Sequence, residues 1–344
     1  MKIYRYLLIA LIGVATGACS NELEKDVKLS VGVNTSADVT YDGTTITVKK
    51  GTPIEFALDG DPDCITFFSG EVGHKYEYKD RVTVDAKDVK TATLSFSVWA
   101  QYGNAETTSG VLSMYVSDQF KGMQKNDFAA DSVSVENFAW TELVPQAELP
   151  QAPVANAGKA QTYSIDLKPY LGKNVTVAIR YKGVSNVASQ PRMNFLDMKI
   201  YNEMADGTTS TLGAGNFGFT PLNMDNKKNY TDQKSMTVNR EYGTVTNNTP
   251  GIWNLVGAST GSFFIQSSGA KAALKYSWLV SNPIEINACT PDTGEAVKNM
   301  TQSLSSYSYT YQTAGTYTAT FYAANANYKK QSTLMKQITI KVVE

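Results

Sequence analysis

The sequence predicts an all-β protein made of β-sandwiches that follow an N-terminal export signal. Apolar and polar residues alternate along most of the chain after residue 26, and a period of two gives each strand one face for a core. Thr, Val and Tyr dominate these runs, and their side chains suit a pleated, half-buried surface. Gly, Asn and Asp turns separate short strands, which favours sandwiches, and no convincing helical period of 3.6 residues appears beyond the signal.

The predicted strands follow one another along the whole chain. The clearest run places Val175, Val177 and Ile179 on one face, directly after a turn that contains Pro and Gly. The other alternating runs lie, in chain order, at 29–33, 46–48, 54–58, 94–98, 274–280, 307–311 and 338–342. Between 207 and 261 the alternation is lost among Gly, Asn, Thr and Lys. We expect long loops there, and loops on a rigid sandwich are where binding residues concentrate.

Residues 1–18 have the order of an export signal. Two basic residues precede an apolar run at 7–14, and small residues stand directly before Cys19. The run is too short to cross a bilayer as a helix, which takes ~20 residues, so we expect it to be cleaved. Small residues followed by Cys resemble the lipobox of bacterial lipoproteins, which implies that Cys19 is acylated and becomes the new N-terminus.

One position departs from the lipobox pattern. Thr16 stands where Leu or Val is usual, so an ordinary secretory signal with an incidental Cys is the alternative. Residues 19–26 are polar and acidic, a composition that stays solvated, and we interpret them as a flexible tether. Acidic residues directly after an acylated Cys resemble the surface-export signal of Bacteroides-group lipoproteins. This resemblance implies that the globular part is exposed at the surface of the outer membrane.

The composition argues against several classes of function. The formal net charge is −1, so the chain lacks the basic footprint that binding to nucleic acid requires. His74 is the single histidine and there are three cysteines, which argues against a zinc site and leaves any catalytic triad dependent on His74. A glycosidase needs two carboxylates roughly 5–10 Å apart, and no Asp or Glu stands out from its surroundings. We therefore expect a protein that is not an enzyme.

Two distant segments resemble parts of a PKD domain, which is a small Ig-like sandwich. Residues 307–321 resemble its last hairpin, and residues 51–70 resemble its opening half. Neither segment is long enough to close a sandwich alone. We therefore predict that residues 27–80 and 286–344 form one discontinuous PKD-like domain, with the middle of the chain inserted at an exposed loop.

The inserted part, residues 81–285, resembles a jelly-roll sandwich of the galactose-binding kind. The segments that carry this resemblance are 112–122, 138–143, 163–167, 177–181 and 195–200. Each segment alone resembles this fold only weakly, and the order and spacing of the five segments carry the resemblance. The predicted fold is thus an Ig/PKD-like β-sandwich plus a jelly-roll β-sandwich.

Taken whole, the chain resembles a family of Bacteroides-group surface lipoproteins encoded beside Sus-type glycan-uptake systems. Residues 67–81 are the most characteristic piece, and part of that family is known only as a domain of unknown function. The resemblance implies capture of polysaccharide or host glycan at the cell surface, beside outer-membrane glycan-uptake proteins. It names no sugar.

Exposed aromatic side chains are the natural candidates for binding such a ligand. The chain has 20 Tyr and 4 Trp, which offer large contact areas at low entropic cost. Trp99 is out of phase with the apolar residues of its run, so it should point away from the core, and Tyr102 follows it at the end of the strand. Trp253 lies in the loosest part of the chain, near Arg240 and Tyr242, and is either an anchor under the loop or exposed to a ligand.

Three acidic residues at alternate positions, Asp59, Asp61 and Asp63, resemble a calcium loop, because hard cations bind several carboxylate oxygens. The alternative is that they form a turn, since Asp bonds its own backbone. The discontinuous domain would also bring Cys64 and Cys289 together, and a disulfide requires their Cα atoms to lie roughly 4.4–6.8 Å apart. Two independent buried thiols are the alternative.

The leading hypothesis is a non-catalytic, surface-exposed lipoprotein that holds oligosaccharide for a partner transporter. The second hypothesis is an adhesin or structural surface protein, and the third is an enzyme that acts on glycans. The disposition of Trp253, Trp99 and Tyr102 separates the first two. Rings exposed on one concave face favour sugar, whereas buried rings under a flat polar surface favour adhesion.

Overall fold

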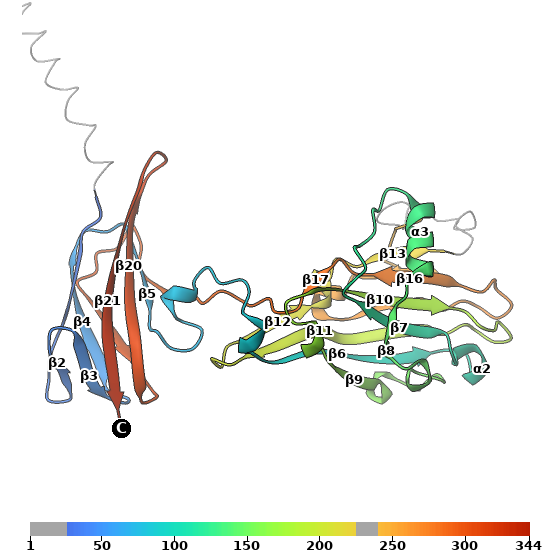
Figure 1. Ribbon diagram of the computed structural model, residues 1–344, viewed down its shortest axis with the longest axis horizontal. Coiled ribbons are helices and arrows are strands. Elements are labelled where there is room, and N and C mark those ends of the chain that lie inside the picture. The colour runs from blue at the N-terminus through green and yellow to red at the C-terminus, as the bar shows by residue number, and fades with distance from the viewer. Residues whose placement is uncertain (1–25, 225–239) are drawn as a thin grey trace, which may run out of the picture. The chain divides into compact units, whose positions relative to one another are not determined.

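The structure is a computed structural model that describes residues 26–224 and 240–344 (Figure 1). It is nearly all β, with 45% strand and 12% helix, which confirms the predicted fold class. The predicted signal peptide, Cys19 and nearly all of the tether lie outside the described residues. Within the described part, no helix is both long and apolar enough to cross a membrane.

The chain divides into two compact units. The first, which we call the discontinuous unit, combines the described residues up to Arg81 with Pro291–Glu344. The second, which we call the inserted unit, is Val82–Thr290. The sequence analysis placed these boundaries after residues 80 and 285.

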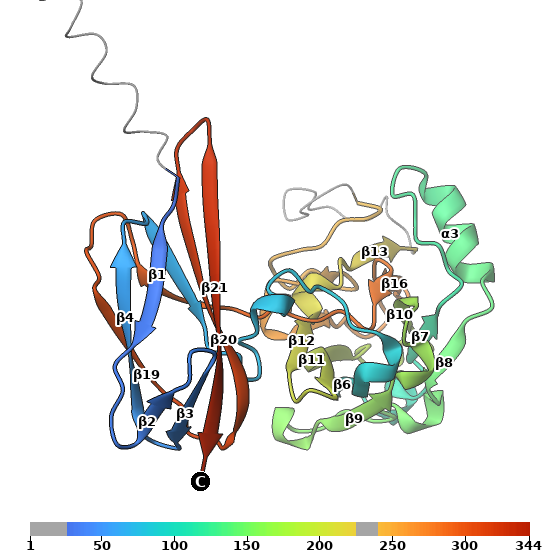
Figure 2. The ribbon, with the colours of Figure 1, turned by 60° about the vertical axis from the view of Figure 1, so that its left-hand side comes forward.

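The discontinuous unit is a sandwich of two sheets. The smaller sheet has the order β1 (Leu29–Val33), β4 (Pro53–Gly60), β19 (Ser306–Thr310). The larger has the order β18 (Glu295–Lys298), β5 (Cys64–Phe68), β20 (Gly315–Ala326), β21 (Gln331–Val343), β3 (Thr45–Lys49), β2 (Val39–Tyr41). Strands β20 and β21 form a long hairpin, visible in red in Figure 2. Because β20 pairs with β5 and β21 with β3, each end of the chain completes a sheet begun by the other.

The core of this unit follows from the alternation along those strands. Phe56 of β4 faces Phe67 of β5 and Phe321 of β20, with ring centroids 5.9 and 5.1 Å away. All three rings are almost fully buried. Residues separated by more than 250 positions thus share one core, so neither terminal segment can bury its apolar face alone.

The inserted unit is a second sandwich of two antiparallel sheets. The β10 sheet has the order β13 (Thr220–Asn223), β16 (Tyr276–Val280), β10 (Asn174–Lys182), β7 (Leu112–Ser117), β8 (Thr141–Val144), and β17 (Ile284–Glu285) also pairs with β10. The β11 sheet has the order β14 (Trp253–Asn254), β15 (Phe263–Ile265), β11 (Arg192–Met204), β6 (Val89–Gln101), β9 (Gln161–Asp166), and β12 (Thr209–Gly213) also pairs with β11. Buried side chains from both sheets form one core.

The two ends of the inserted unit lie side by side. Cys289 N donates to the carbonyl oxygen of Val82 at 2.8 Å, and Thr83 forms a β-bridge with Ala288. An inserted domain needs adjacent ends if it is to leave its host undisturbed. This pairing also moves the boundary beyond Cys289.

The predicted disulfide between Cys64 and Cys289 is wrong. Cys64 is exposed in β5 of the discontinuous unit, whereas Cys289 belongs to the inserted unit and packs against its core. No disulfide joins the two residues. The expectation failed because the pairing of Val82 with Cys289 draws this short segment into the other unit.

The expectation of no helix was also wrong, because α3 (Phe128–Asn137) and the short α2 (Ala105–Thr108) are helical. The apolar residues of α3 form no stripe, and Val133 is 61% exposed. Polar contacts hold the helix instead. Asp127 caps its first turn, and buried Asp131 accepts hydrogen bonds from two backbone N–H groups and from the Tyr242 hydroxyl. The predicted loop region likewise contains short strands, namely β12, β13 and β14.

We expect residues 82–290 to fold alone, because this segment has its own closed core and adjacent ends. All four Trp residues lie within it, so Trp fluorescence reports on this unit only. Urea should unfold the fragment in a single cooperative transition with the same midpoint as the Trp signal of the full chain.

The matched control is residues 27–81 alone, which should stay unfolded because β3 and β5 lack their partner strands. A fragment 82–290 without a cooperative transition would contradict the division into two units.

Candidate functional site

Four residues form a row across the outer face of the β11 sheet. In register, Trp99 of β6 lies opposite Asn194 of β11, Asn194 opposite Phe264 of β15, and Phe264 opposite Asn254 of β14. We call these four residues the outer row. Side chains of a strand alternate between the two faces of the sheet, so the residue next to each member of the outer row faces the core. These core residues are Val98, Phe195, Phe263 and Trp253.

The outer row lies in a pocket of about 590 Å³, which we call the Trp99 pocket. Its remaining lining includes Arg192 and residues of the connections on either side of β14, among them Thr246 and Asn248. Asn254 holds this wall in place, because its Nδ2 donates to Asn247 O at 3.1 Å and its Oδ1 accepts from Val256 N at 3.0 Å. The pocket therefore combines a rigid strand floor with a wall of small polar residues.

Among the described residues, Arg192 is the one charged residue that lines the Trp99 pocket. It lies two positions before Asn194 in β11, and its guanidinium carbon is 3.4 Å from the centroid of the Phe264 ring. Burial lowers the pKa of Arg192, and the nearby Tyr102 phenol acts in the opposite direction. Because an arginine starts from a pKa above 12, the side chain stays protonated.

Three donors in the pocket are buried without a hydrogen-bond partner among residues 26–224 and 240–344. They are Trp99 Nε1, Asn194 Nδ2 and Arg192 Nε. A buried polar group without a partner costs about 1–3 kcal/mol, and most such groups in native proteins are satisfied. All three atoms belong to residues that line the Trp99 pocket.

The comparison with known families identifies the chain. Residues 21–216 match the model of a family described as Domain of unknown function (DUF5017). The chain is a member of the DUF5017 family. No curated protein matches it.

The match confirms the expectation that part of the chain is catalogued as a domain of unknown function. The matched residues contain Trp99, Arg192 and Asn194 and end before Asn254 and Phe264. Within this DUF5017 protein, the floor of the Trp99 pocket on β6 and β11 thus falls inside the family match, whereas part of its wall falls outside.

The structure corrects the position of Trp253. Its side chain is fully buried on the inner face of the β11 sheet, and its Nε1 donates to Ser277 Oγ at 3.0 Å. Of the two alternatives for this residue, the buried anchor is correct. The region is not a loose loop at this point but strand β14, in which Asn254 rather than Trp253 faces the pocket.

Tyr242 and Arg240 do not line the Trp99 pocket either. The Tyr242 ring is buried in a cluster on the β10 sheet, and its hydroxyl donates to Asp131 Oδ2 at 2.8 Å. Burial and this hydrogen bond to Asp131 raise the pKa of Tyr242. The carbonyl oxygen of Arg240 accepts from Asn223 Nδ2 of β13. Proximity in sequence to Trp253 was misleading, because β13 and β14 belong to different sheets.

Of the predicted candidates, Trp99 lines the pocket, whereas Tyr102 is not part of the lining and lies near Arg192. Trp99 faces away from the core, as its phase in the strand predicts, although only 9% of it is exposed. Tyr102 follows β6 with a φ of 69° and is 50% exposed beside Arg192. Sequence reasoning missed Arg192 and Asn194. The alternation of the sequence from Pro191 to Phe195 was the available signal, because Arg192 and Asn194 are each polar residues between two apolar ones.

The calcium site predicted at Asp59, Asp61 and Asp63 is wrong. In the described part of the chain, no three His, Cys, Asp or Glu residues cluster as metal ligands would. Gly60, with a φ of 131°, bends the chain between the first two residues. Asp63 instead binds the β20–β21 hairpin, because its Oδ2 accepts from Ala326 N at 3.2 Å.

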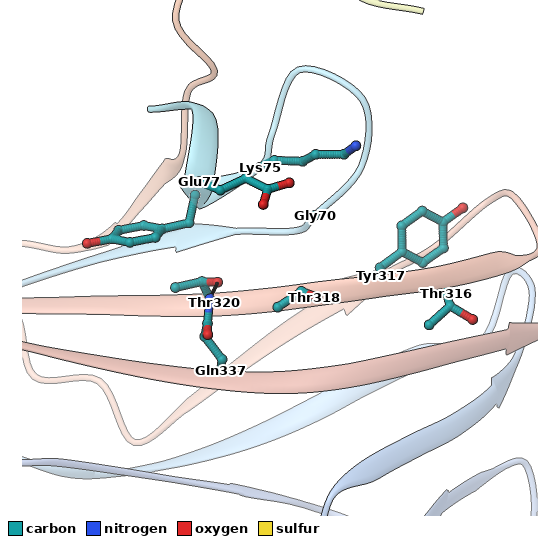
Figure 3. Close-up of a pocket in the computed structure, with 9 residues that line it drawn as sticks. Gly70, Lys75, Glu77, Thr316, Tyr317, Thr318, Thr320 and Gln337 are labelled. Atoms are coloured by element: carbon teal, nitrogen blue, oxygen red, sulfur yellow. Dashed lines mark hydrogen bonds between the residues drawn. The ribbon is translucent and has the colours of Figure 1, made fainter. Parts of the chain in front are cut away.

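A second pocket, of about 400 Å³, lies in the discontinuous unit (Figure 3). Its floor carries Thr318 and Thr320 of β20 and Gln337 of β21, and Gln337 Nε2 donates to Thr320 Oγ1 at 3.2 Å. Lys75 and Glu77 line it from the segment above. None of the partnerless buried atoms found in the described residues belongs to its lining. The Trp99 pocket is therefore the better candidate site.

We expect Trp253→Ala to destabilise the inserted unit by about 3–5 kcal/mol, because it leaves a closed cavity in the core. Trp99→Ala should cost less than half as much, since its ring borders a pocket that is open to solvent. Urea unfolding followed by the remaining Trp fluorescence measures both values. Equal losses of unfolding free energy in the two variants would contradict the prediction, because they would show that the two rings have the same kind of environment.

Proposed function

We propose that this protein is a non-catalytic glycan-binding lipoprotein of the cell surface, and that it binds sugar in the Trp99 pocket. The observation that supports this most is the set of three partnerless buried donors, on Trp99, Asn194 and Arg192, around one pocket. A sugar presents many hydroxyl oxygens to such donors. Its C–H faces suit contact with aromatic rings.

The size and rigidity of the pocket fit a ligand of a few sugar units. Small-molecule sites occupy roughly 300–1,000 Å³, and the Trp99 pocket has about 590 Å³. Its floor is carried by β6 and β11, each 13 residues long and paired along most of their length. Groups held by paired strands lose little freedom on binding, which favours affinity.

The proposed binding mode relies on hydrogen bonds more than on stacking. Only a small part of Trp99 is exposed, so little of its ring is available for stacking. The half-exposed ring of Tyr102 lies close by and offers a surface for contact with a sugar face. This mode differs from the expected one, in which Trp253 was the main stacking platform.

We expect Trp99→Ala and Asn194→Ala each to weaken glycan binding about tenfold, because each removes a donor worth about 1.4 kcal/mol. A glycan array with the full chain identifies a ligand, and affinity gel electrophoresis with that glycan measures the variants. The control is Tyr328→Ala, which removes an 88% exposed ring from the discontinuous unit and should leave binding unchanged.

Failure of the array to show any bound glycan would refute the proposal and favour the adhesin alternative. Turnover of a bound glycan would refute its non-catalytic part. Binding that both pocket variants retain in full would move the site away from the Trp99 pocket.

The proposed location of the protein at the cell surface is based on the sequence of residues 1–26. We propose that Cys19 carries the lipid, that the acidic tether leads to the globular part, and that the partners are outer-membrane glycan-uptake proteins. The first described residues join the discontinuous unit, where Val27 N donates to Ser332 Oγ at 3.1 Å. The tether would then attach directly to the sandwich that contains β1.

Cys19→Ser should abolish incorporation of radiolabelled palmitate and release the protein from the membrane fraction, because it removes the acylated thiol. Cys64→Ser is the matched control, since it removes an exposed thiol of the discontinuous unit and should leave labelling intact. Undiminished labelling of the Cys19→Ser protein would place the lipid elsewhere or rule it out.

A further inference from the structure

We infer that the Trp99 pocket selects an acidic sugar, and that Arg192 binds the carboxylate of a uronic or similar sugar acid. This inference rests on the proposed function, because it names the class of glycan bound at the same site. Within the part of the chain that the structure describes, three observations carry it: the missing partner of Arg192, the absence of acidic residues from the pocket lining, and the aromatic ring over the guanidinium plane.

Arg192 differs from Arg81 and Arg180 at the end of its side chain, although the Nε atoms of all three are buried without a hydrogen-bond partner among the described residues. Arg81 forms an ion pair with Asp292 at 3.4 Å and lies over the Tyr78 ring. Arg180 donates to Ser113 Oγ at 2.9 Å. The Arg192 guanidinium contacts the Phe264 ring, but it has no hydrogen bond or ion pair with the described residues.

The lining of the pocket leaves this charge unopposed. Among residues 26–224 and 240–344, its polar lining apart from Arg192 consists of Thr, Ser and Asn together with the Trp99 indole, and no Asp or Glu of these ranges lines it. A charge that is partly removed from water and lacks an opposite charge is unfavourable. An anionic ligand would supply the opposite charge, whereas a neutral sugar would supply hydrogen-bond acceptors only.

The geometry favours a carboxylate over a sulfate ester. The Phe264 ring, 3.4 Å from the guanidinium carbon, covers one face of the plane, so an anion must approach at the edge where the N–H groups point. A planar carboxylate matches this edge with two parallel hydrogen bonds. The neighbouring donors of Trp99 and Asn194 would then bind sugar hydroxyls. A single cation also suits one carboxylate better than the dense charge of a sulfated chain.

The test compares glycans that differ in charge. The full chain is screened against neutral galactan and cellulose oligosaccharides, oligogalacturonate, hyaluronan oligosaccharides, sialyllactose and carrageenan oligosaccharides, which carry sulfate but no carboxylate. Each carboxylate-bearing glycan that binds is reduced at its carboxyl groups to give a neutral partner with the same linkages. We expect a carboxylate-bearing glycan to bind and its reduced partner to bind about tenfold more weakly.

The variants separate a role in recognition from a role in folding. Arg192→Gln should remove the preference for the acidic glycan and leave binding of the reduced glycan within about twofold. Arg192→Lys keeps the charge but not the two parallel donors, so it should retain part of the preference. Arg180→Gln is the matched control, because Arg180 lies over aromatic rings on the other sheet and should not affect the preference. Thermal unfolding confirms that each variant is folded.

Each result of these binding experiments either supports or overturns the inference. Equal affinity for acidic and reduced glycans, or a loss with Arg192→Gln that is the same for both, would overturn it while the proposed function stands. Binding of sulfated glycans alone would also overturn it and assign the pocket to sulfate. If no glycan binds at all, the proposed function fails together with the inference.

Discussion

The pairing of β6 with β11 is the interaction on which the inserted unit depends. These two 13-residue strands run antiparallel through the centre of the β11 sheet, and their register sets which side chains meet. Val98 and Phe195 face each other in the core, whereas Trp99 and Asn194 face each other on the outer surface. A shift by one residue would exchange these two sets, which would bury amides and expose aromatic rings. The register of these two strands therefore determines both the packing of the core and the side chains of the candidate site.

The outer face of the β11 sheet brings together several buried donors that lack partners. Some buried polar groups elsewhere are satisfied locally, as at Asp131, which ties α3 to Tyr242, whereas others, such as Arg180 Nε and Asn202 Oδ1, also lack a partner among the described residues. In the Trp99 pocket, buried donors lack partners among the described residues, and Arg192 has an aromatic ring but no acid beside it. Each such donor costs stability, and a fold usually accepts that cost where a ligand is bound. The large core of the inserted unit can offset it.

The two-unit architecture explains why the family match does not follow a structural boundary. Residues 21–216 begin before β1 and end at the short helix Ala214–Asn216. The match therefore includes β3 and β5 but not β20 and β21, which pair with them. Because each end of the chain completes the sheet of the other, the matched segment alone is not a folding unit. The paired ends at Val82 and Cys289 allow the inserted sandwich to fold within this arrangement.

The sequence by itself determined the all-β class and the outward phase of Trp99, because both depend on alternation within one strand. The residue counts, with a single histidine, also argued against a zinc site. Only the tertiary structure decided that Trp253 is buried, that Asn254 and Arg192 line the pocket, and that Cys64 and Cys289 belong to different units. It also revealed α3, which is held by polar contacts rather than by an apolar stripe. The physical reason is the same in each case. The environment of a side chain is set by partner strands that lie far away in the sequence, and alternation within one strand does not specify the register or the partner of that strand.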